Sequence, residues 1–500
     1  MSDISEKNGS EDRIDDIEKV ANSRGSATPV DAHYDPKFVK KTLLMIDWRM
    51  LPLLGLLYAI ALVDRTNMGV ARTAGMLKDL RLDIGERYSI ASMIYFVPYI
   101  ILQIPANLVL RKLGAQTFLT ICVVGWGAAQ VGMGFVTNWG LLCVTRVLLG
   151  IFEAGFFPAL VFIITTWYKR HEVQKRLAVF YLCSIVIGGF SSILAYGITF
   201  LKGKGGLNGW QWIFVLEGIL TILLGVLTWM FVPDFPDKAR FLNDNQRKMI
   251  LDRIEADRAD SMPDKMARQK FFAAFFDPLT WSFAIMFMAS TMPAYAIGFF
   301  STIIINGMGY SAAMALLLTA FPYVAAAISC FFFAWLADKT RMRAVWLAAQ
   351  NVICIIGLMC TGYTSSPAVR YFGLFFINMG ASGCVPGVLA YVSPLNLTDW
   401  HMRLTYDVQH SNNITQHSKR AVSTATIIAM GGVGGIFATT VYRQEDYPRY
   451  IPGIWATMAC QFTMLTLLAI NSFVFARRNR LYREGKRGPP EDTPGFSYTI

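Results

Sequence analysis

The sequence predicts an all-α membrane protein with twelve transmembrane helices arranged as two repeats of six. The first observation is composition: 54% of the 500 residues are hydrophobic and only 16% are charged, with a mean hydropathy of +0.41. A water-exposed surface for a chain of this length needs more charge. The second is a series of apolar segments of roughly 20 residues, each able to cross about 30 Å of hydrocarbon. The third is a long charged segment that separates six of them from the other six.

The expected spans lie near residues 50–72, 88–110, 116–137, 139–166, 177–200, 211–232, 279–305, 312–336, 344–363, 370–391, 421–442 and 452–476. They divide the chain into a cytoplasmic N-terminal tail (1–48), an N-terminal six-helix half (49–232), a cytoplasmic central loop (233–278), a C-terminal six-helix half (279–476) and a cytoplasmic C-terminal tail (477–500). A short basic turn follows the second span (107–116), and another follows the eighth (334–343), which is the second span of the other half. A repeated six-helix unit accounts for this correspondence.

The distribution of positive charge predicts the orientation. Lysine and arginine are about fourfold more numerous in the N-terminal tail and the alternate loops on its side than in the opposite loops. Both termini are therefore expected in the cytoplasm. The first 41 residues contain no apolar signal region, so the first span is expected to direct insertion. No organelle address is present, and the plasma membrane is the expected location.

Several function classes are excluded by the same features. The formal charge of +12 is scattered between apolar segments rather than gathered on one patch, so a nucleic acid partner is not expected. The eight cysteines lie in apolar stretches without metal-ligand spacing, so neither a metal site nor a disulfide framework is expected. No phosphate-binding GxxxxGK[ST] motif occurs. We expect no cofactor and no enzymatic activity.

Apart from Arg72 and Arg370, which are end residues of their spans, five charged residues lie within the expected spans, all in the first half: Asp64, Arg65, Arg146, Glu153 and Glu217. A charge at this depth costs about 2.5–3.5 kcal/mol on insertion scales, so each needs a reason to be there. Inside their end residues, the expected spans of the second half contain no Asp, Glu, Lys, Arg or His. We therefore expect the N-terminal half to carry the ion chemistry, and the C-terminal half to supply shape, aromatic rings and amides.

The spacing of these charges limits how they can pair. Arg146 and Glu153 share a helix face but lie about 10 Å apart along the axis, too far for a direct ion pair. Asp64 and Arg65 are adjacent, so they point about 100° apart and cannot both face the same neighbour. Arginine keeps its charge and suits a carboxylate ligand. Asp64 or Glu153 could exchange a proton and couple its movement to that of an anion.

Structural alternatives remain open for the individual residues. The charged groups could instead be pairs that tie helices together. Arg65 lies near the outer end of its span and could extend its guanidinium to the membrane surface. For Glu217, in the segment WQWIFVLEG, a structural role is the favoured interpretation.

The second half offers weaker candidates. Gln350, Asn351 and Asn378 are of a type that more often forms interhelical hydrogen bonds than ligand contacts. Tyr295, Phe299 and Phe300 could stack on a substrate ring, although aromatic residues at such spacing are more often packing. We include Tyr295 and Asn378 in the expected substrate site.

Several segments together resemble the major facilitator superfamily, and within it the fungal allantoate permease branch of the anion:cation symporter family. They are LVDRTNMGVA (62–71), RVLLGIFEAGFFPALVFIITTWYKRHE (146–172), GWQWIFVLEG (209–218), VPDFPDKARFL (232–242) and NNITQHSKRAV (412–422). The resemblance covers roughly residues 45 to 480.

The resemblance implies proton-coupled uptake of a small organic anion or vitamin-like carboxylate, such as allantoate, nicotinate or pantothenate, by alternating access. It places Asp64 and Glu153 as proton carriers, and Arg65 and Arg146 at or near the anion path. The site is expected at the midplane between the halves. Relatives that carry glutamate or sialic acid have an arginine in the seventh span, which this chain lacks. A less charged substrate and a monomeric protein in the lipid bilayer are expected.

One segment departs from the family pattern. In relatives the tenth span leads almost directly into the NN…KRA stretch, whereas residues 392–409 (VSPLNLTDWHMRLTYDVQ) intervene here. We hypothesise a retained intron in the gene model, because the codons can begin with GT and end with AG. A genuine cytoplasmic loop is the alternative. Sequencing cDNA across this segment distinguishes the two.

Two other functions compete with anion import. An efflux carrier for a drug or secondary metabolite would use the same fold, and sequence does not give the direction of transport. A non-transporting nutrient sensor is a third hypothesis. Such sensors usually carry an enlarged cytoplasmic extension, and both tails are short here.

Overall fold

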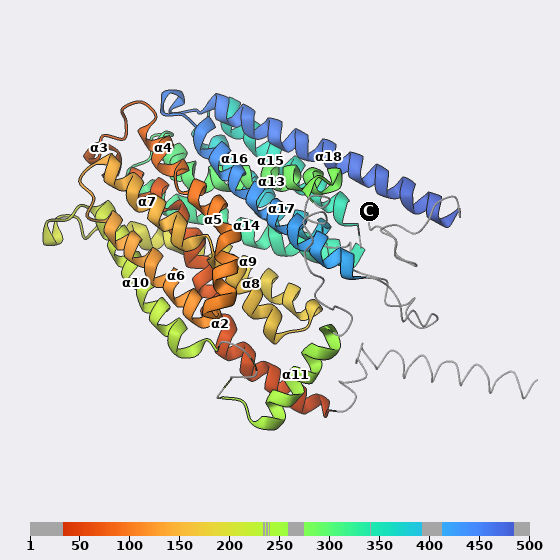
Figure 1. Ribbon diagram of the computed structural model, residues 1–500. Helices are drawn as coiled ribbons and strands as arrows, with labels where there is room; N and C mark the ends of the chain where they lie inside the picture. The colour runs from red at the N-terminus through yellow and green to blue at the C-terminus, as the bar shows by residue number, and fades with distance from the viewer. Residues whose placement is uncertain are drawn as a thin grey trace, which may run out of the picture.

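The computed structural model describes residues 34–233, 236, 239, 241–258, 275–340, 342–392 and 413–484 (Figure 1). These residues form helices joined by turns, and the described ranges contain no strand. The anomalous segment at 392–409 lies outside them except for its first residue, as do most of the expected N-terminal tail and much of the central loop.

The N-terminal half consists of α2 (Pro36–Ala71), η2 (Arg72–Met76), α3 (Leu77–Asp79), α4 (Arg87–Met93), α5 (Phe96–Leu113), α6 (Ala115–Met133), α7 (Trp139–Glu153), α8 (Phe156–Trp167), α9 (Arg170–Thr199), η3 (Lys204–Gly206) and α10 (Gly209–Phe231). Two of the expected spans are each divided into two helices. Both breaks lie just before a proline, Pro98 or Pro158. Proline lacks the N–H group that would continue the helical hydrogen bonding.

The C-terminal half follows α11 (Asp244–Arg258) of the central loop. It consists of α13 (Pro278–Asn306), α14 (Ala312–Thr340), α15 (Arg343–Tyr363), α16 (Pro367–Val392), α17 (Asn413–Val441), η7 (Gln444–Asp446) and α18 (Ile451–Arg483). Across the described residues, nine helices are long and apolar enough to cross a membrane. The spans expected at 88–110, 116–137 and 421–442 are helical but fall outside those nine. The total of twelve therefore stays a prediction.

The two halves converge toward one end of the bundle. In Figure 1 the red-to-yellow helices of the first half and the green-to-blue helices of the second approach each other near α3 and α4. Contacts between the halves join α2 to α13, α5 and α4 to α17, and α9 to α14. At the other end, α11 and the end of α18 lie far apart. We call these the α3 end and the α11 end.

Close packing of backbone and side chains seals the α3 end. A Cβ atom at Gly69 in α2 would overlap the carbonyl oxygen of Phe299 in α13. The Thr302 hydroxyl donates to the Gly69 carbonyl oxygen at 3.1 Å. Next to this crossing, Arg72 hydrogen-bonds to Gln444 and lies with its guanidinium carbon 4.4 Å from the centre of the Tyr88 ring. Helices of both halves are therefore in direct backbone contact at this end.

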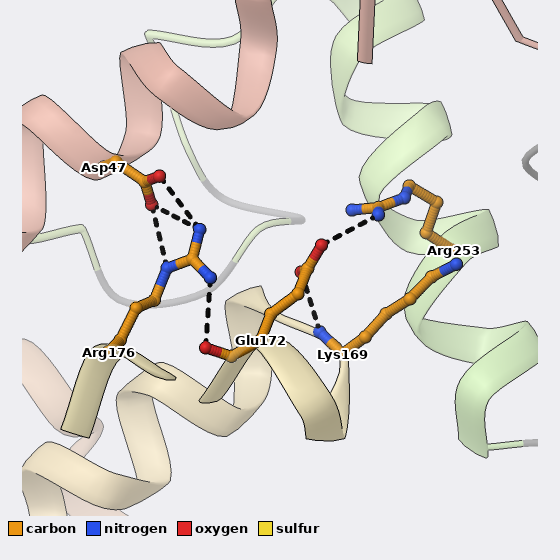
Figure 2. A network of polar contacts seen from close by, with 5 residues as sticks. All are labelled: Asp47, Lys169, Glu172, Arg176 and Arg253. Atoms are coloured by element: carbon orange, nitrogen blue, oxygen red, sulfur yellow. Dashed lines mark hydrogen bonds and ion pairs between the residues drawn. The ribbon is translucent and has the colours of Figure 1, made fainter. Parts of the chain in front are cut away.

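A polar network holds α11 against the first half at the α11 end (Figure 2). Arg176 of α9 forms an ion pair with Asp47 of α2 at 2.8 Å, and Arg253 of α11 forms one with Glu172 of α9 at 3.1 Å. The other carboxylate oxygen of Glu172 accepts the backbone N–H of Lys169, which caps α9. The pairs are largely shielded from water, so they are stronger than exposed pairs.

Replacing Arg253 by methionine is expected to lower the melting temperature of the detergent-purified protein by about 2–5 °C, because Glu172 loses a partly buried partner. The matched control is Arg480→Met, which removes an exposed pair with Glu484 in which the Arg480 side chain is 81% exposed. Thermal unfolding of both variants checks the difference. Equal melting temperatures would show that the α11 contact contributes no stability.

Candidate functional site

Four of the predicted site residues meet where α2, α7 and α13 face one another. Arg65 of α2 forms an ion pair with Glu153, the last residue of α7, and donates a hydrogen bond to the Tyr295 hydroxyl of α13 at 2.6 Å. Arg65 and Glu153 are only 6% and 2% exposed. Arg65 therefore does not reach the membrane surface, and the alternative in which it does is wrong. Its charge is held between the two halves of the molecule.

Arg146 lies on the same face of α7 as Glu153, seven residues before it. It is fully buried, and its Nη2 atom donates to the carbonyl oxygen of Arg65 at 3.2 Å. Its Nε and Nη1 atoms have no hydrogen-bond partner among the described residues. A buried guanidinium with open donors is a strong binding group for an anion, because charge-assisted hydrogen bonds to a carboxylate are the strong ones. As the spacing predicted, Arg146 does not pair with Glu153.

Aromatic rings from the start of α5 surround both arginines. The guanidinium carbon of Arg65 lies 5.3 Å from the Tyr95 ring centre and 4.8 Å from that of Tyr99, and that of Arg146 lies 5.1 Å from the Tyr95 ring centre. Such rings attract cations through their faces. The sequence analysis missed both tyrosines. The available signal in the sequence was that the two tyrosines are four residues apart, at the point where α5 begins.

Asp64 faces the opposite side of α2 and is enclosed within the first half. Its carboxylate accepts hydrogen bonds from Trp126 and Gln130 of α6 and from Thr221 of α10, each at 3.2 Å. The prediction that Asp64 and Arg65 face different neighbours is confirmed. One turn further along α2, Asn67 donates to Glu217 of α10.

The remaining second-half candidates are not brought to the arginines. The only hydrogen bond recorded for Asn378 within the described chain is from Ser382 of its own helix, at 3.5 Å. Phe299 and Phe300 are fully buried, and Phe300 stacks on Tyr442 with the ring centres 4.9 Å apart. This confirms the packing interpretation for these two aromatic residues. Tyr295 is the second-half residue that contributes a polar group here.

The arrangement combines buried positive charge, a paired carboxylate and hydroxyl groups, which differs from the ligand set of a metal site. Within the described ranges, no group of three or more His, Cys, Asp or Glu side chains could hold a metal ion. The site contains fixed positive charge, one paired carboxylate and hydroxyl groups from both halves. These are the components of a binding site for a small polar molecule at the centre of a two-half membrane transporter.

Comparison with known proteins identifies the class. Residues 54–395 match the family model described as Major Facilitator Superfamily. The match spans more than half of the chain, so the protein belongs to this superfamily. It is a multi-pass membrane transporter for small molecules.

Curated relatives and solved structures agree with this assignment. The chain is 31% identical to the uncharacterized transporter C11D3.18C of Schizosaccharomyces pombe over 85% of this chain and 82% of that protein. It is 28% identical to the major facilitator-type transporter hxnP of Emericella nidulans over 89% and 88%. The fold is similar to that of the xylose transporter XylE from E. coli in a partially occluded inward-open conformation, with a TM-score of 0.62, 12% identity and coverage of 84% and 96%.

Proposed function

We propose that the protein is a proton-coupled importer of a small organic anion, of the allantoate, nicotinate or pantothenate class, working by alternating access. The observation that carries the proposal is Arg146, a fully buried cation with two nitrogen atoms that lack partners in the described structure. It lies beside the Arg65–Glu153 ion pair. A substrate carboxylate satisfies these open donors and balances the surplus positive charge.

The coupling follows from competition for Arg65. A substrate carboxylate approaching Arg146 also attracts the Arg65 guanidinium, which Glu153 holds. A proton on Glu153 removes its charge and frees Arg65 for the anion. Anion binding and protonation of Glu153 therefore favour each other, and the linkage is reciprocal. Asp64 is the second acidic group of the proposed coupling set, with its partners inside the first half.

In the proposed topology the twelve spans place both termini and α11 in the cytoplasm, so the sealed α3 end is extracellular. The conformation then corresponds to an inward-facing state. Tyr295 supports this assignment of the site, because it connects α13 of the second half to Arg65 of the first. We propose the plasma membrane as the location and a monomer as the working unit.

Uptake of a panel of labelled carboxylates by cells expressing the protein tests the proposal. We expect one compound to accumulate faster at acidic than at neutral external pH, because Glu153 must take up a proton. Arg146→Ala should abolish uptake, and Glu153→Gln should remove its dependence on pH. An exposed-residue variant, Arg443→Gln, serves as the control.

Each other outcome has a defined meaning. If cells take up none of the compounds but retain less of one of them, the protein is an efflux carrier and the import proposal is wrong. Uptake that is equal at both pH values in the wild type would contradict proton coupling. Uptake that is unaffected by Arg146→Ala would show that Arg146 does not bind the anion.

A further inference from the structure

A buried polar cluster lies inside the first half, on the side of α2 that faces α6 and α10. It is formed by two carboxyl groups and four neutral side chains of α2, α6 and α10: Asp64, Asn67, Trp126, Gln130, Glu217 and Thr221. All of them are buried; Asp64 is 1% and Glu217 6% exposed. The sequence analysis favoured a structural role for Glu217. The hydrogen bonds in the cluster indicate a different one.

The donors in the cluster are distributed unequally between the two carboxyl groups. Asp64 accepts hydrogen bonds from an indole N–H and an amide N–H, and it shares the Thr221 hydroxyl with the backbone carbonyl oxygen of Glu217. Glu217 accepts one, from Asn67 at its Oε2 atom. The Oε1 atoms of Glu217 and Gln130 are buried acceptors without any partner among the described residues. Donors stabilise a charged carboxylate, so Asp64 is the group suited to carry the charge.

No ion pair to either carboxyl group of the cluster is present within the described chain. The nearest charged side chains belong to the anion site, where Arg65 is paired with Glu153 and Arg146 lies close enough to act on Asp64 through space. From α2, Arg65 faces Glu153 of α7 and Tyr295 of α13; from α7, Arg146 donates to the Arg65 carbonyl oxygen. The groups that α6 and α10 present to the two carboxyls are otherwise neutral.

The two carboxyl groups are also close to each other. Asp64 and Asn67 are three residues apart on α2, and their partners Thr221 and Glu217 are four apart on α10. The two hydrogen-bonded contacts are therefore one helical turn apart. Two negative charges at this separation, shielded from water and without an ion-pair partner among the described residues, repel each other, as in carboxyl pairs that share one proton.

We propose that Glu217 binds an exchangeable proton, so that this cluster is a proton site separate from the Arg65–Glu153 pair. A proton on Oε1 of Glu217 removes the negative charge from this carboxyl group and turns its unpartnered acceptor into an O–H donor. Asp64 is the charged carboxylate of the pair while Glu217 holds the proton. On release, the O–H bond at Glu217 breaks and the proton passes to water, while the electron pair stays on the carboxylate oxygen. No other reactant is needed.

The link to transport rests on the proposed function. Asp64, Arg65 and Asn67 lie within one turn of α2, so a shift of α2 when an anion reaches Arg65 also changes the contacts of Asp64 and Asn67 with α10. The proton affinity of Glu217 then depends on whether an anion occupies the anion site. A Glu217 that served only to tie α2 to α10 would keep its proton throughout.

Infrared spectroscopy of the purified protein tests the protonation state without any transport. We expect the C=O stretching band of a buried protonated carboxyl at neutral pH in wild type and in Asp64→Asn. The band should be absent in Glu217→Gln, which keeps an acceptor for Asn67. Glu445→Gln, at an exposed acid, is the control. A band that persists in Glu217→Gln and disappears in Asp64→Asn would place the proton on Asp64 and overturn the proposal.

A transport assay then tests whether the proton is exchanged. Glu217→Gln mimics the permanently protonated acid, so we expect it to retain exchange of labelled for unlabelled anion while losing concentrative, pH-driven uptake by at least about tenfold. Retention of wild-type accumulation with the wild-type pH profile would refute exchange at Glu217. If the wild type itself shows no pH-dependent anion uptake, the proposed function is wrong. The infrared measurement still tests protonation of Glu217, because it does not depend on transport.

Discussion

Replacing Arg65 by glutamine is expected to reduce uptake of the transported anion by at least about 100-fold, with a lower melting temperature as well. The physical reason is that Glu153, only 2% exposed, loses its ion-pair partner and remains as a buried charge. The variant also removes the hydrogen bond to Tyr295, which connects the halves. Uptake at saturating substrate and thermal unfolding of the purified protein are the two measurements.

The double variant Arg65→Gln/Glu153→Gln separates the two consequences. It no longer contains the unpaired Glu153 charge, so its melting temperature should recover toward that of the wild type, while uptake stays low because the coupling pair is absent. Recovery of transport in the double variant would contradict a direct role for the pair in anion transport. A melting temperature as low as in the single variant would show that the charge is not the cause of the instability.

The second large effect is expected at the crossing of α2 and α13. Gly69→Ala should lower uptake by at least about tenfold, because its methyl group overlaps the carbonyl oxygen of Phe299 and prevents closure of the α3 end. A protein that cannot close this end cannot complete alternating access. The matched control is Gly197→Ala in α9, where a Cβ atom meets nothing within 4 Å.

Labelling from the outside distinguishes this mechanism from misfolding. Thr302 is 2% exposed and donates to the Gly69 carbonyl oxygen. In a chain whose eight native cysteines are replaced, we expect Thr302→Cys to react faster with a membrane-impermeant maleimide when Gly69→Ala is also present, because that variant keeps the α3 end open. Equal labelling in both backgrounds would refute the role of this crossing in closure.

The prediction of a helical membrane protein depended on local properties and was confirmed. Apolar segment length and the scarcity of charge are visible in any stretch of sequence, because every membrane-crossing helix must bury its own backbone in hydrocarbon. The helix breaks before Pro98 and Pro158 were not predicted. They divide the spans beside Tyr95 and after Glu153, and so help to position two residues of the site.

The sequence by itself determined which charged residues fall within long apolar segments, and which of them cannot pair. Helical periodicity separates Arg146 from Glu153 and turns Asp64 away from Arg65, whatever surrounds them. Only the tertiary structure decided the partners: Glu153 with Arg65, and Asn67 with Glu217. Periodicity gives the face of one helix, whereas the neighbour that this face meets depends on packing between segments far apart in the chain. For that reason Tyr95, Tyr99 and the donor shortage at Glu217 became visible only in the folded protein.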